Sequence, residues 1–367
     1  MNKIKLNVKT KSKTYPIIIG KNVITQISSI LKSNNINFKK TLIIVDSKIP
    51  KKKLNILKKK IFAKKFIFFF NASEKNKNLK SVNKILNKLL KNNFSRNDCL
   101  ISLGGGITGD ISGFAASIFK RGIKFINVAT TLLSMVDSSV GGKQGYNVDE
   151  GKNLIGSFYQ PDCVISDITL LNSLPKREII CGYGEILKHS IIDNKKTFNY
   201  LTKNFYKIIK LKSPFIEKAI LDSCKIKKKI VEKDEKEKDL RKILNLGHSF
   251  AHAYEAALSY SKKLNHGEAV ILGIKSAAKF SFQNNIINRK DYKQIISHIS
   301  NLNINTNLNH YFKKKDVNKL IKFMKSDKKN NSSKINLILI KGIGKILIKM
   351  KFNELIIKKF LIKELIY

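Results

Sequence analysis

The alternation of short apolar runs with polar segments constrains the fold more than any other feature of this sequence. Four strand-like runs occur in the first 130 residues: TLIIVD (41–46), KFIFFF (65–70), CLISLGGG (99–106) and KFINVAT (124–130). Polar or helix-patterned stretches separate them, including DISGFAASIFKRG, which Gly122 closes. Strands interleaved with helices imply a parallel sheet with crossover connections. The first half is therefore predicted to be an α/β domain.

The pattern changes after about Pro175. Apolar residues then recur at helical spacing in the segments at 178–192, 213–235 and 247–260, and a final amphipathic helix is expected near NELIIKKFLIKELIY. A strand-like run at 334–350 interrupts this helical half. A chain of 367 residues suits two domains. We predict an α/β domain over 1–175 and an α-helical domain over 176–367.

The formal charge of +46 invites a nucleic-acid interpretation, but the kind of basic residue argues against it. Of the 72 basic residues only five are arginine, and the lysines are spread along the chain beside Asn and Ile. Nucleic-acid readers favour arginine and interleaved aromatic side chains, whereas AT-rich codons produce a Lys, Asn and Ile excess. No apolar run reaches the length of a membrane span. Neither a specific nucleic-acid partner nor a membrane is expected.

The cysteines indicate a reducing compartment. Cys99, Cys163, Cys181 and Cys224 form no C-x-x-C pair and lie in apolar or helical contexts. The N-terminal residues have no signal-peptide apolar block. We expect reduced, buried thiols and a cytoplasmic protein.

A glycine-rich turn, SLGGGITGD (102–110), lies between an expected strand and an expected helix. Gly104, Gly106 and Gly109 satisfy G-x-G-x-x-G, which lets backbone amides and a helix N-terminus approach a pyrophosphate. Tight packing of the turn alone is the competing explanation. The motif lies a hundred residues into the chain, and no acidic residue ends a strand twenty residues later. Asp46, from an earlier strand, is a candidate ribose partner.

Three of the six histidines fall within nineteen positions. His248 and His252 share a helical face at i and i+4, and His266 belongs to the next segment. Glu185 in GYGEILKH is the best candidate for a further ligand from another helix. Two histidines and a glutamate suit a catalytic zinc site, which keeps one coordination position open. Ordinary packing or surface histidines are the alternative.

The segment VDSSVGGKQGYNVDEGKNLIGSFYQP (136–161) is dense in polar residues. Asp137, Lys143, Lys152 and Asn153 are embedded among glycines, which suits a loop that folds over an anionic ligand. A merely solvated loop is the alternative.

Seven blocks, in order, resemble the 3-dehydroquinate synthase family over nearly the whole chain. They are SEKNKNLKS, SLGGGITGDISGFAAS, TTLLSMVDSSVGGK, GKNLIGSFYQP, GEILKH, DEKEKDLRKILNLGHSFAHAYEA and NHGEAV. The resemblance implies a Rossmann-like N-terminal domain with NAD, an all-α C-terminal domain, and an active site in the cleft between them. It also implies a divalent metal, zinc or cobalt, and a homodimer.

The implied activity is that of a phosphate-eliminating cyclase in the shikimate pathway of aromatic amino acid biosynthesis. It converts 3-deoxy-D-arabino-heptulosonate 7-phosphate to 3-dehydroquinate and phosphate, and NAD is regenerated in each turnover. Positioned lysines and arginines would hold the two anionic ends of this sugar phosphate.

The resemblance also implies a role for each matched residue. The metal ligands would be Glu185, His248 and His266. The cofactor set, with Gly109 and Asp137 from the segments above, would be Asp46, Glu74, Lys77, Gly105, Gly106, Gly109, Asp110, Thr130, Thr131, Asp137, Lys143 and Lys152. The substrate's carboxylate end would take Lys143, Lys227, Arg241 and Asn245. Lys152, Asn153, Lys188 and His252 would lie nearer the phosphate, which Arg121 would reach from a second subunit.

Several positions depart from the family pattern. Gln144 stands where Thr usually follows GGK, Ala129 replaces a Pro, and Ala251 and Asp239 each replace a Gly. The usual PDGE is reduced to NASE. A substitution of Gly is costly only where the backbone needs a positive φ.

Two other enzyme classes remain as alternatives. One is another sugar phosphate cyclase, of the 2-deoxy-scyllo-inosose synthase type, with the same metal and NAD chemistry. The other is a metal-dependent polyol dehydrogenase, which would not need paired anion clamps.

Overall fold

The structure is a computed structural model that describes residues 3–326 and 334–366. The chain packs as two compact units, each formed by two segments: Met1–Gly182 with Tyr206–Lys236, and Tyr183–Phe205 with Glu237–Tyr367. Residues 206–236, which include helix α7 (Phe215–Lys233), therefore pack with the first half of the chain. The domain boundary expected at residue 175 stays a prediction.

The first unit contains a seven-stranded sheet in the order β1-β2-β9-β6-β5-β3-β4. Neighbouring strands in this sheet are parallel, except that β1 pairs antiparallel with β2. The strands are β1 (Ile4–Lys9), β2 (Thr14–Gly20), β3 (Lys40–Asp46), β4 (Lys64–Phe70), β5 (Cys99–Gly104), β6 (Lys124–Ala129) and β9 (Cys163–Asp167). The four strands expected from the apolar runs are all present, and the α/β prediction is confirmed.

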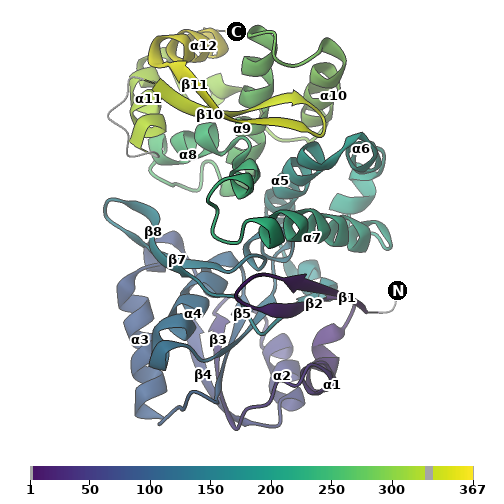
Figure 1. Ribbon diagram of the computed structural model, residues 1–367, viewed down its shortest axis with the longest axis vertical. Helices are drawn as coiled ribbons and strands as arrows, with labels where there is room; N and C mark the ends of the chain where they lie inside the picture. The colour runs from purple at the N-terminus through teal and green to yellow at the C-terminus, as the bar shows by residue number, and fades with distance from the viewer. Residues whose placement is uncertain (1–2, 327–333, 367) are drawn as a thin grey trace. The chain divides into compact units, whose positions relative to one another are not determined.

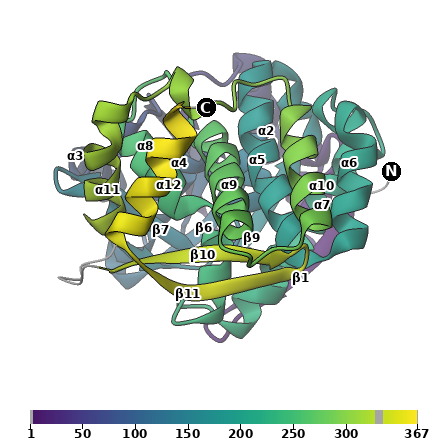
Figure 2. The same cartoon turned by 90° about the horizontal axis from the view of Figure 1, so that it is seen from above.

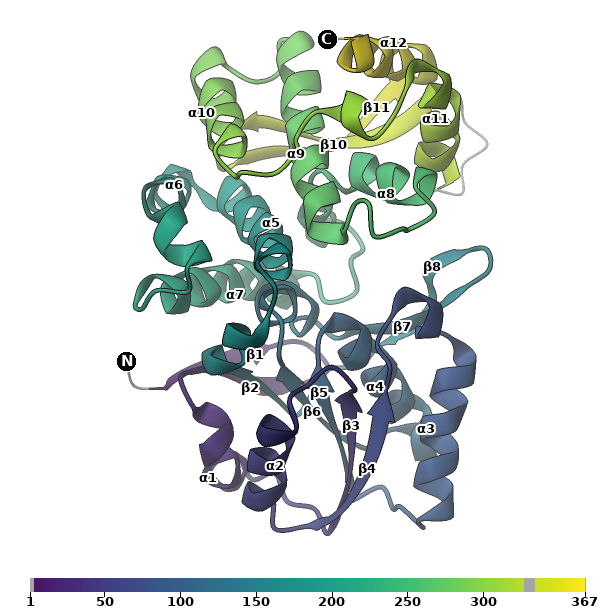
Figure 3. The same cartoon turned by 180° about the vertical axis from the view of Figure 1, so that it is seen from behind.

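Helices cover both faces of this sheet (Figures 1 and 3). Successive strand residues point to opposite faces, so Ile43 and Val45 of β3 join one apolar cluster while Leu42 and Ile44 join another. The first cluster includes residues of α1 (Ile27–Ser33) and α2 (Lys51–Lys60). The second includes residues of α3 (Leu79–Lys91) and α4 (Gly106–Ile118). The central strands β3, β5, β6 and β9 are therefore buried on both sides, which explains why they are continuous apolar runs.

The polar segment after β6 differs from the expected loop. It contains the turn η4 (Ser134–Ser138) and an antiparallel hairpin of β7 (Lys143–Val148) and β8 (Gly151–Phe158). Most of β8 is exposed, so burial imposes no apolar alternation on it, and the sequence shows none.

The second unit is mainly helical, as predicted, with one two-stranded addition. Its helices are α5 (Lys176–Asp193) and α6 (Lys195–Ile209), both of which continue into the first unit, and α8 (His248–Ala257), α9 (His266–Gln283), α10 (Arg289–Ser300), α11 (Val317–Ser326) and α12 (Glu354–Ile366). The strand-like run forms a hairpin of β10 (Lys334–Gly342) and β11 (Lys345–Asn353). Figure 2 shows this hairpin beside α9, against which β10 packs.

All four cysteines are buried and free. Across residues 3–326 and 334–366, helices long enough to cross a membrane lack the necessary apolar character.

A buried histidine makes the stability of the second unit depend on pH. His298 is 2% exposed, its Nε2 lies 2.8 Å from the Tyr183 hydroxyl, and burial lowers its pKa from 6.5 to about 4. As the pH falls, the unfolded chain takes up this proton first, so the folded state loses stability between about pH 6.5 and pH 4. The full loss is roughly 3 kcal/mol. His298→Gln should flatten this part of the profile of melting temperature against pH. Equal slopes in variant and parent would contradict the assignment.

Candidate active site

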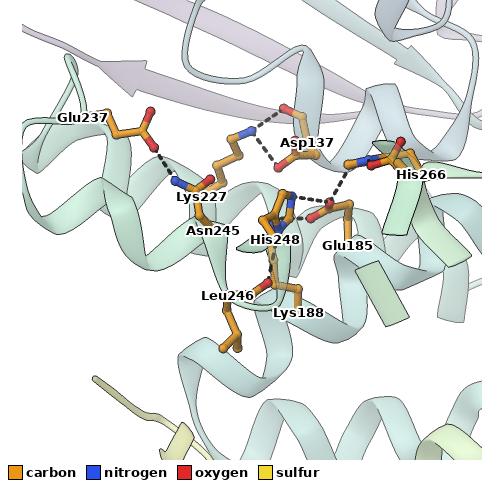
Figure 4. Close-up of polar contacts among 10 residues, drawn as sticks. Asp137, Glu185, Lys188, Lys227, Glu237, Asn245, Leu246, His248 and His266 are labelled. Carbon is orange, nitrogen blue, oxygen red and sulfur yellow. Dashed lines mark hydrogen bonds and ion pairs between the residues drawn. The ribbon is translucent and has the colours of Figure 1, made fainter. Parts of the chain in front are cut away.

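Glu185, His248 and His266 converge within the second unit (Figure 4). The Oε1 atom of Glu185 lies 3.5 Å from Nε2 of His248 and 3.5 Å from Nε2 of His266. One ligand atom from each residue lies within 4.8 Å of the other two. Glu185 is 1% exposed, and the ammonium of the buried Lys188 forms an ion pair with it. These are the three side chains that the sequence suggested as metal ligands.

Close helix contacts made by glycines bring two of these ligands together. Gly184 precedes Glu185 on α5, and Gly267 follows His266 in the first turn of α9. A Cβ on Gly184 would lie only 2.6 Å from the carbonyl oxygen of Gly267. Only glycine at this position lets α5 approach the start of α9 so closely.

A second glycine contact positions the third ligand. Gly247, at φ +79°, precedes His248 at the start of α8, and a Cβ there would lie 2.8 Å from the nitrogen of Ile274. Facing it on α9, a Cβ on Gly273 would lie 2.2 Å from the Gly247 carbonyl oxygen. The α8–α9 crossing therefore requires glycine on both helices.

Hydrogen bonds behind the histidines orient their rings. Nδ1 of His266 lies 3.0 Å from Oε2 of Glu255, and Nδ1 of His248 lies 3.2 Å from the carbonyl oxygen of Leu246. When Nδ1 carries the proton in such a bond, the lone pair of Nε2 is left free to bind a metal. Both Nε2 atoms face Glu185. Sequence reasoning did not identify Glu255. The only feature of the sequence that could have indicated it is its position on the same helix as His248.

The charges around the three residues favour an anionic carboxylate and a neutral His248. Burial opposes ionisation of Glu185, but Lys188 and the two imidazoles outweigh it and hold its pKa well below 4.5. Burial and the charge of Lys188 lower the pKa of His248 to about 4. Burial acts in the same direction on His266, but Glu255 and Glu185 outweigh it and raise its pKa to about 10. A metal ion binding here would displace the proton of His266.

This donor set fits a divalent metal. A carboxylate and two imidazoles, each ring with a second hydrogen-bond partner, match the ligands of catalytic zinc sites with an open position. His252 lies next to the group, with its ring centroid 5.3 Å from that of His248, but is not among the three converging donors.

Glycines in the turn before α4 allow side chains from other segments to lie close to the N-terminus of this helix. Gly105 caps this helix, and a Cβ there would lie 3.0 Å from Cγ2 of Thr131. A Cβ on Gly106 would lie 2.9 Å from Oγ of Ser138. Asp46 ends β3, whose Val45 pairs with Leu103 of β5, so its backbone lies at the same sheet edge as the turn. The predicted cofactor residues Thr130, Gly109 and Asp110 lie on the elements that adjoin this turn.

Two other predicted cofactor residues bind the β7–β8 hairpin. Nζ of Lys77 lies 2.5 Å from Oδ2 of Asp110 and 2.5 Å from Oδ1 of Asn153. Oε1 of Glu74 lies 3.1 Å from Nζ of Lys152. Burial opposes ionisation of Glu74, but Lys152 and other neighbours outweigh it and lower its pKa. Lys77 therefore joins Asp110 of the cofactor set to Asn153 of the phosphate set, and Glu74 holds Lys152.

Two of the four residues predicted for the substrate's carboxylate end, Lys227 and Asn245, are held by acidic neighbours. In the first unit, Nζ of Lys227 lies 2.7 Å from Oδ1 and 2.8 Å from the carbonyl oxygen of Asp137 (Figure 4). In the second unit, Nδ2 of Asn245 donates to Oε1 of Glu237 over 2.7 Å.

The two predicted arginines have different environments. Arg241 is 1% exposed, in a short 3-10 helix, so its guanidinium is a buried charge. Arg121 is exposed, as is Lys143 at the start of β7. Arg121 lies within three consecutive residues of positive φ, Lys120 to Gly122. Its predicted role in a second subunit stays a prediction.

The departures from the family pattern fit without backbone strain. Asp239 has φ −148°, and its carboxylate lies 2.6 Å from Nζ of Lys349. Ala129 ends a strand, and Ala251 lies inside α8. Gln144 is buried over Gly113, where a Cβ would lie 2.4 Å from its Cδ. The larger side chain is therefore accommodated by a glycine on α4.

The parallel α/β unit, the helical unit and the three converging donors define the class of protein: a two-unit α/β and helical chain with a candidate site for a divalent metal. A solved 2-deoxy-scyllo-inosose synthase, complexed with carbaglucose-6-phosphate, NAD⁺ and Co²⁺, matches with a TM-score of 0.88 at 23% identity, covering 98% of this chain and 100% of that one. The 2-epi-5-epi-valiolone synthase of Streptomyces hygroscopicus, with NAD⁺ and Zn²⁺ bound, matches with a TM-score of 0.86 at 19% identity, covering 97% and 98%. These likenesses concern the fold.

The chain belongs to the 3-dehydroquinate synthase family. The family models for the N-terminal and C-terminal parts of 3-dehydroquinate synthase match residues 67–181 and 182–330. The 3-dehydroquinate synthase of Pelagibacter ubique is 60% identical over 366 residues, which is 100% of each chain. The predicted family, fold and enzyme class are confirmed.

Proposed function

We propose that this chain converts 3-deoxy-D-arabino-heptulosonate 7-phosphate to 3-dehydroquinate and phosphate, the reaction of its family. The observation that carries this assignment is the convergence of Glu185, His248 and His266 in a chain that matches the family throughout. Phosphate can leave once a neighbouring hydroxyl is oxidised to a ketone, because the ketone acidifies the adjacent C–H. The overall reaction has no net oxidation, so the hydride acceptor must return its hydride in the same turnover.

Two cofactors fit the two units. The solved relatives carry NAD⁺ with Co²⁺ or Zn²⁺, and we assign the same pair here. When bound, NAD supplies a reversible hydride acceptor and the metal supplies a Lewis acid for vicinal hydroxyls. Glu185, His248 and His266 would hold the metal, and the α4 N-terminus with the glycine turn would hold the pyrophosphate.

The basic residues would orient the two anionic ends of the substrate. Arg241 offers a buried guanidinium, which can bind a carboxylate through two parallel hydrogen bonds. We assign Asn245 and Lys227 to the same carboxylate. Their hydrogen bonds to acidic residues limit the movement of both side chains. Lys152, Asn153, Lys188 and His252 are assigned to the phosphate, whose charge grows as it leaves.

The assignment includes a location and an assembly. We place the enzyme in the cytoplasm, because its four cysteines are buried free thiols. We also assign a homodimer in which Arg121 serves the partner's phosphate site. A specific nucleic-acid partner is not part of this proposal.

The test is phosphate release by the purified full-length chain. With 3-deoxy-D-arabino-heptulosonate 7-phosphate, NAD and Zn²⁺ or Co²⁺, we expect release that a chelator stops and that accumulates no NADH. A hexose 6-phosphate lacks the carboxylate and should give no release. Release from the hexose phosphate alone would favour a cyclase of the 2-deoxy-scyllo-inosose synthase type. Stoichiometric NADH from a simple polyol, without phosphate release, would favour a dehydrogenase.

A further inference from the structure

The pairing of β7 with β8 breaks at Asn147. Lys143 to Tyr146 pair in regular order with Phe158 to Ile155, and Val148 then pairs with Gly151. Lys152, Asn153 and Leu154 therefore all lie opposite Asn147 alone, and β8 contains a bulge there. Bulges bend a strand and re-aim its side chains, often beside active sites. This one contains the hairpin residues assigned above to the substrate phosphate.

Asn147 makes hydrogen bonds on both sides of the bulge. Its Oδ1 accepts from the backbone N–H of Asn153 over 3.1 Å. Its Nδ2 donates to Oε2 of Glu74 over 2.8 Å, and its backbone N–H donates to the carbonyl oxygen of Lys77 over 2.7 Å. One side chain thus supplies an acceptor to the bulged Asn153 and ties the hairpin to residues 74–77.

Contacts hold both the backbone and the side chain of the bulged residue. Asn153 has φ +56°, in the left-handed region that asparagine adopts more often than most residues other than glycine. Its backbone is held by Asn147, and its side-chain oxygen accepts from Nζ of Lys77 over 2.5 Å. Lys77 is itself 4% exposed and paired with Asp110. The next residue back, Lys152, is paired with Glu74, which Asn147 also holds.

We infer that Asn147 is a positioning residue for anion binding. It holds the bulge so that Lys152 and Asn153 are arranged to receive the phosphate of the substrate, and it links this arrangement to Glu74 and Lys77, which are assigned to the cofactor. This inference rests on the proposed function. Asn147 acts through its neighbours, since the hydrogen-bonding groups of its side chain are engaged by Glu74 and Asn153.

Two substitutions separate the acceptor from the donor of Asn147. Asn147→Ala removes both, whereas Asn147→Asp keeps an acceptor for the Asn153 N–H but replaces the donor to Glu74 by a carboxylate that repels it. Glu150→Gln, exposed in the turn of the same hairpin, is the control. The readouts are kcat and KM for the sugar phosphate, melting temperature, and hydrogen exchange of the peptide that spans the bulge.

For Asn147→Ala we expect KM to rise roughly tenfold, as for one lost hydrogen bond, with kcat changed less than about threefold. Exchange at the bulge should become faster while the melting temperature stays near that of the parent. Asn147→Asp should raise KM at least as much as Asn147→Ala, because its carboxylate repels Glu74 and the substrate phosphate. Glu150→Gln should match the parent in every readout.

Three results would overturn the inference. They are a parental KM with parental exchange in Asn147→Ala, a parental KM in Asn147→Asp, and a fall in kcat that accompanies general loss of stability. A parent protein that releases no phosphate would refute the proposed function instead. Exchange at the bulge needs no substrate, so it tests the role of Asn147 in holding the bulge in that case as well.

Discussion

Glu185→Gln is expected to lose its bound metal and to lower kcat/KM by a factor of about 10³ or more. The amide keeps the volume of the side chain but removes the negative charge that faces both imidazoles and Lys188. Metal content should fall below roughly a tenth of that of the parent after dialysis. The measurement is metal per chain by elemental analysis, together with phosphate release at saturating NAD.

The control is Glu178→Gln, the same chemical change at an exposed position on the first turn of α5. It should keep both metal and turnover. A folded Glu185→Gln protein with parental metal content and turnover would show that Glu185 is not a ligand. Circular dichroism establishes that the variant is folded before metal is measured.

Gly273→Ala is expected to destabilise the second unit although alanine favours helices. In an open helix this change would stabilise by about 1 kcal/mol. Here the new Cβ would lie 2.2 Å from the Gly247 carbonyl oxygen, so α8 and α9 must separate. We expect a loss of roughly 2–3 kcal/mol, as for other overpacked contacts, and weaker metal binding because His248 follows Gly247 directly.

Urea unfolding with and without added Zn²⁺ measures both effects. Gln283→Ala, exposed at the end of α9, is the control and should change stability by less than about 0.5 kcal/mol. An unchanged or higher stability in Gly273→Ala would mean that the α8–α9 contact tolerates a methyl group, and that glycine is not what sets the spacing of the two histidines.

The elements that could be predicted are those whose burial imposes a pattern. β3 and β5 are buried on both faces, so each is an apolar run that needs no knowledge of its neighbours. β8 is exposed and has no such pattern, so the hairpin was expected to be a loop. The grouping of α7 with the first unit was also not predictable, because its helical periodicity does not say which neighbour covers its apolar face.

Some residues of the candidate site could be predicted from the sequence, and others could not. Local chemistry and family motifs were enough to select Glu185, His248 and His266, because carboxylate and imidazole are recognisable as metal ligands wherever they occur. They were not enough to find Glu255 or Asn147. Each of these acts by a hydrogen bond to a residue whose proximity depends on helix crossing or strand register.

Periodicity in the chain was sufficient to predict an α/β half and a helical half, and residue chemistry together with the family motifs selected the candidate metal ligands. Tertiary packing alone decided that α5, α8 and α9 approach closely enough for these side chains to meet, through Gly184, Gly247 and Gly273. It also decided which oxygen atoms orient the two imidazole rings and which carboxylates hold the lysines. The physical reason is that hydrophobic pattern is a property of neighbours in sequence, whereas distances of 3 Å between side chains arise only when separate elements pack.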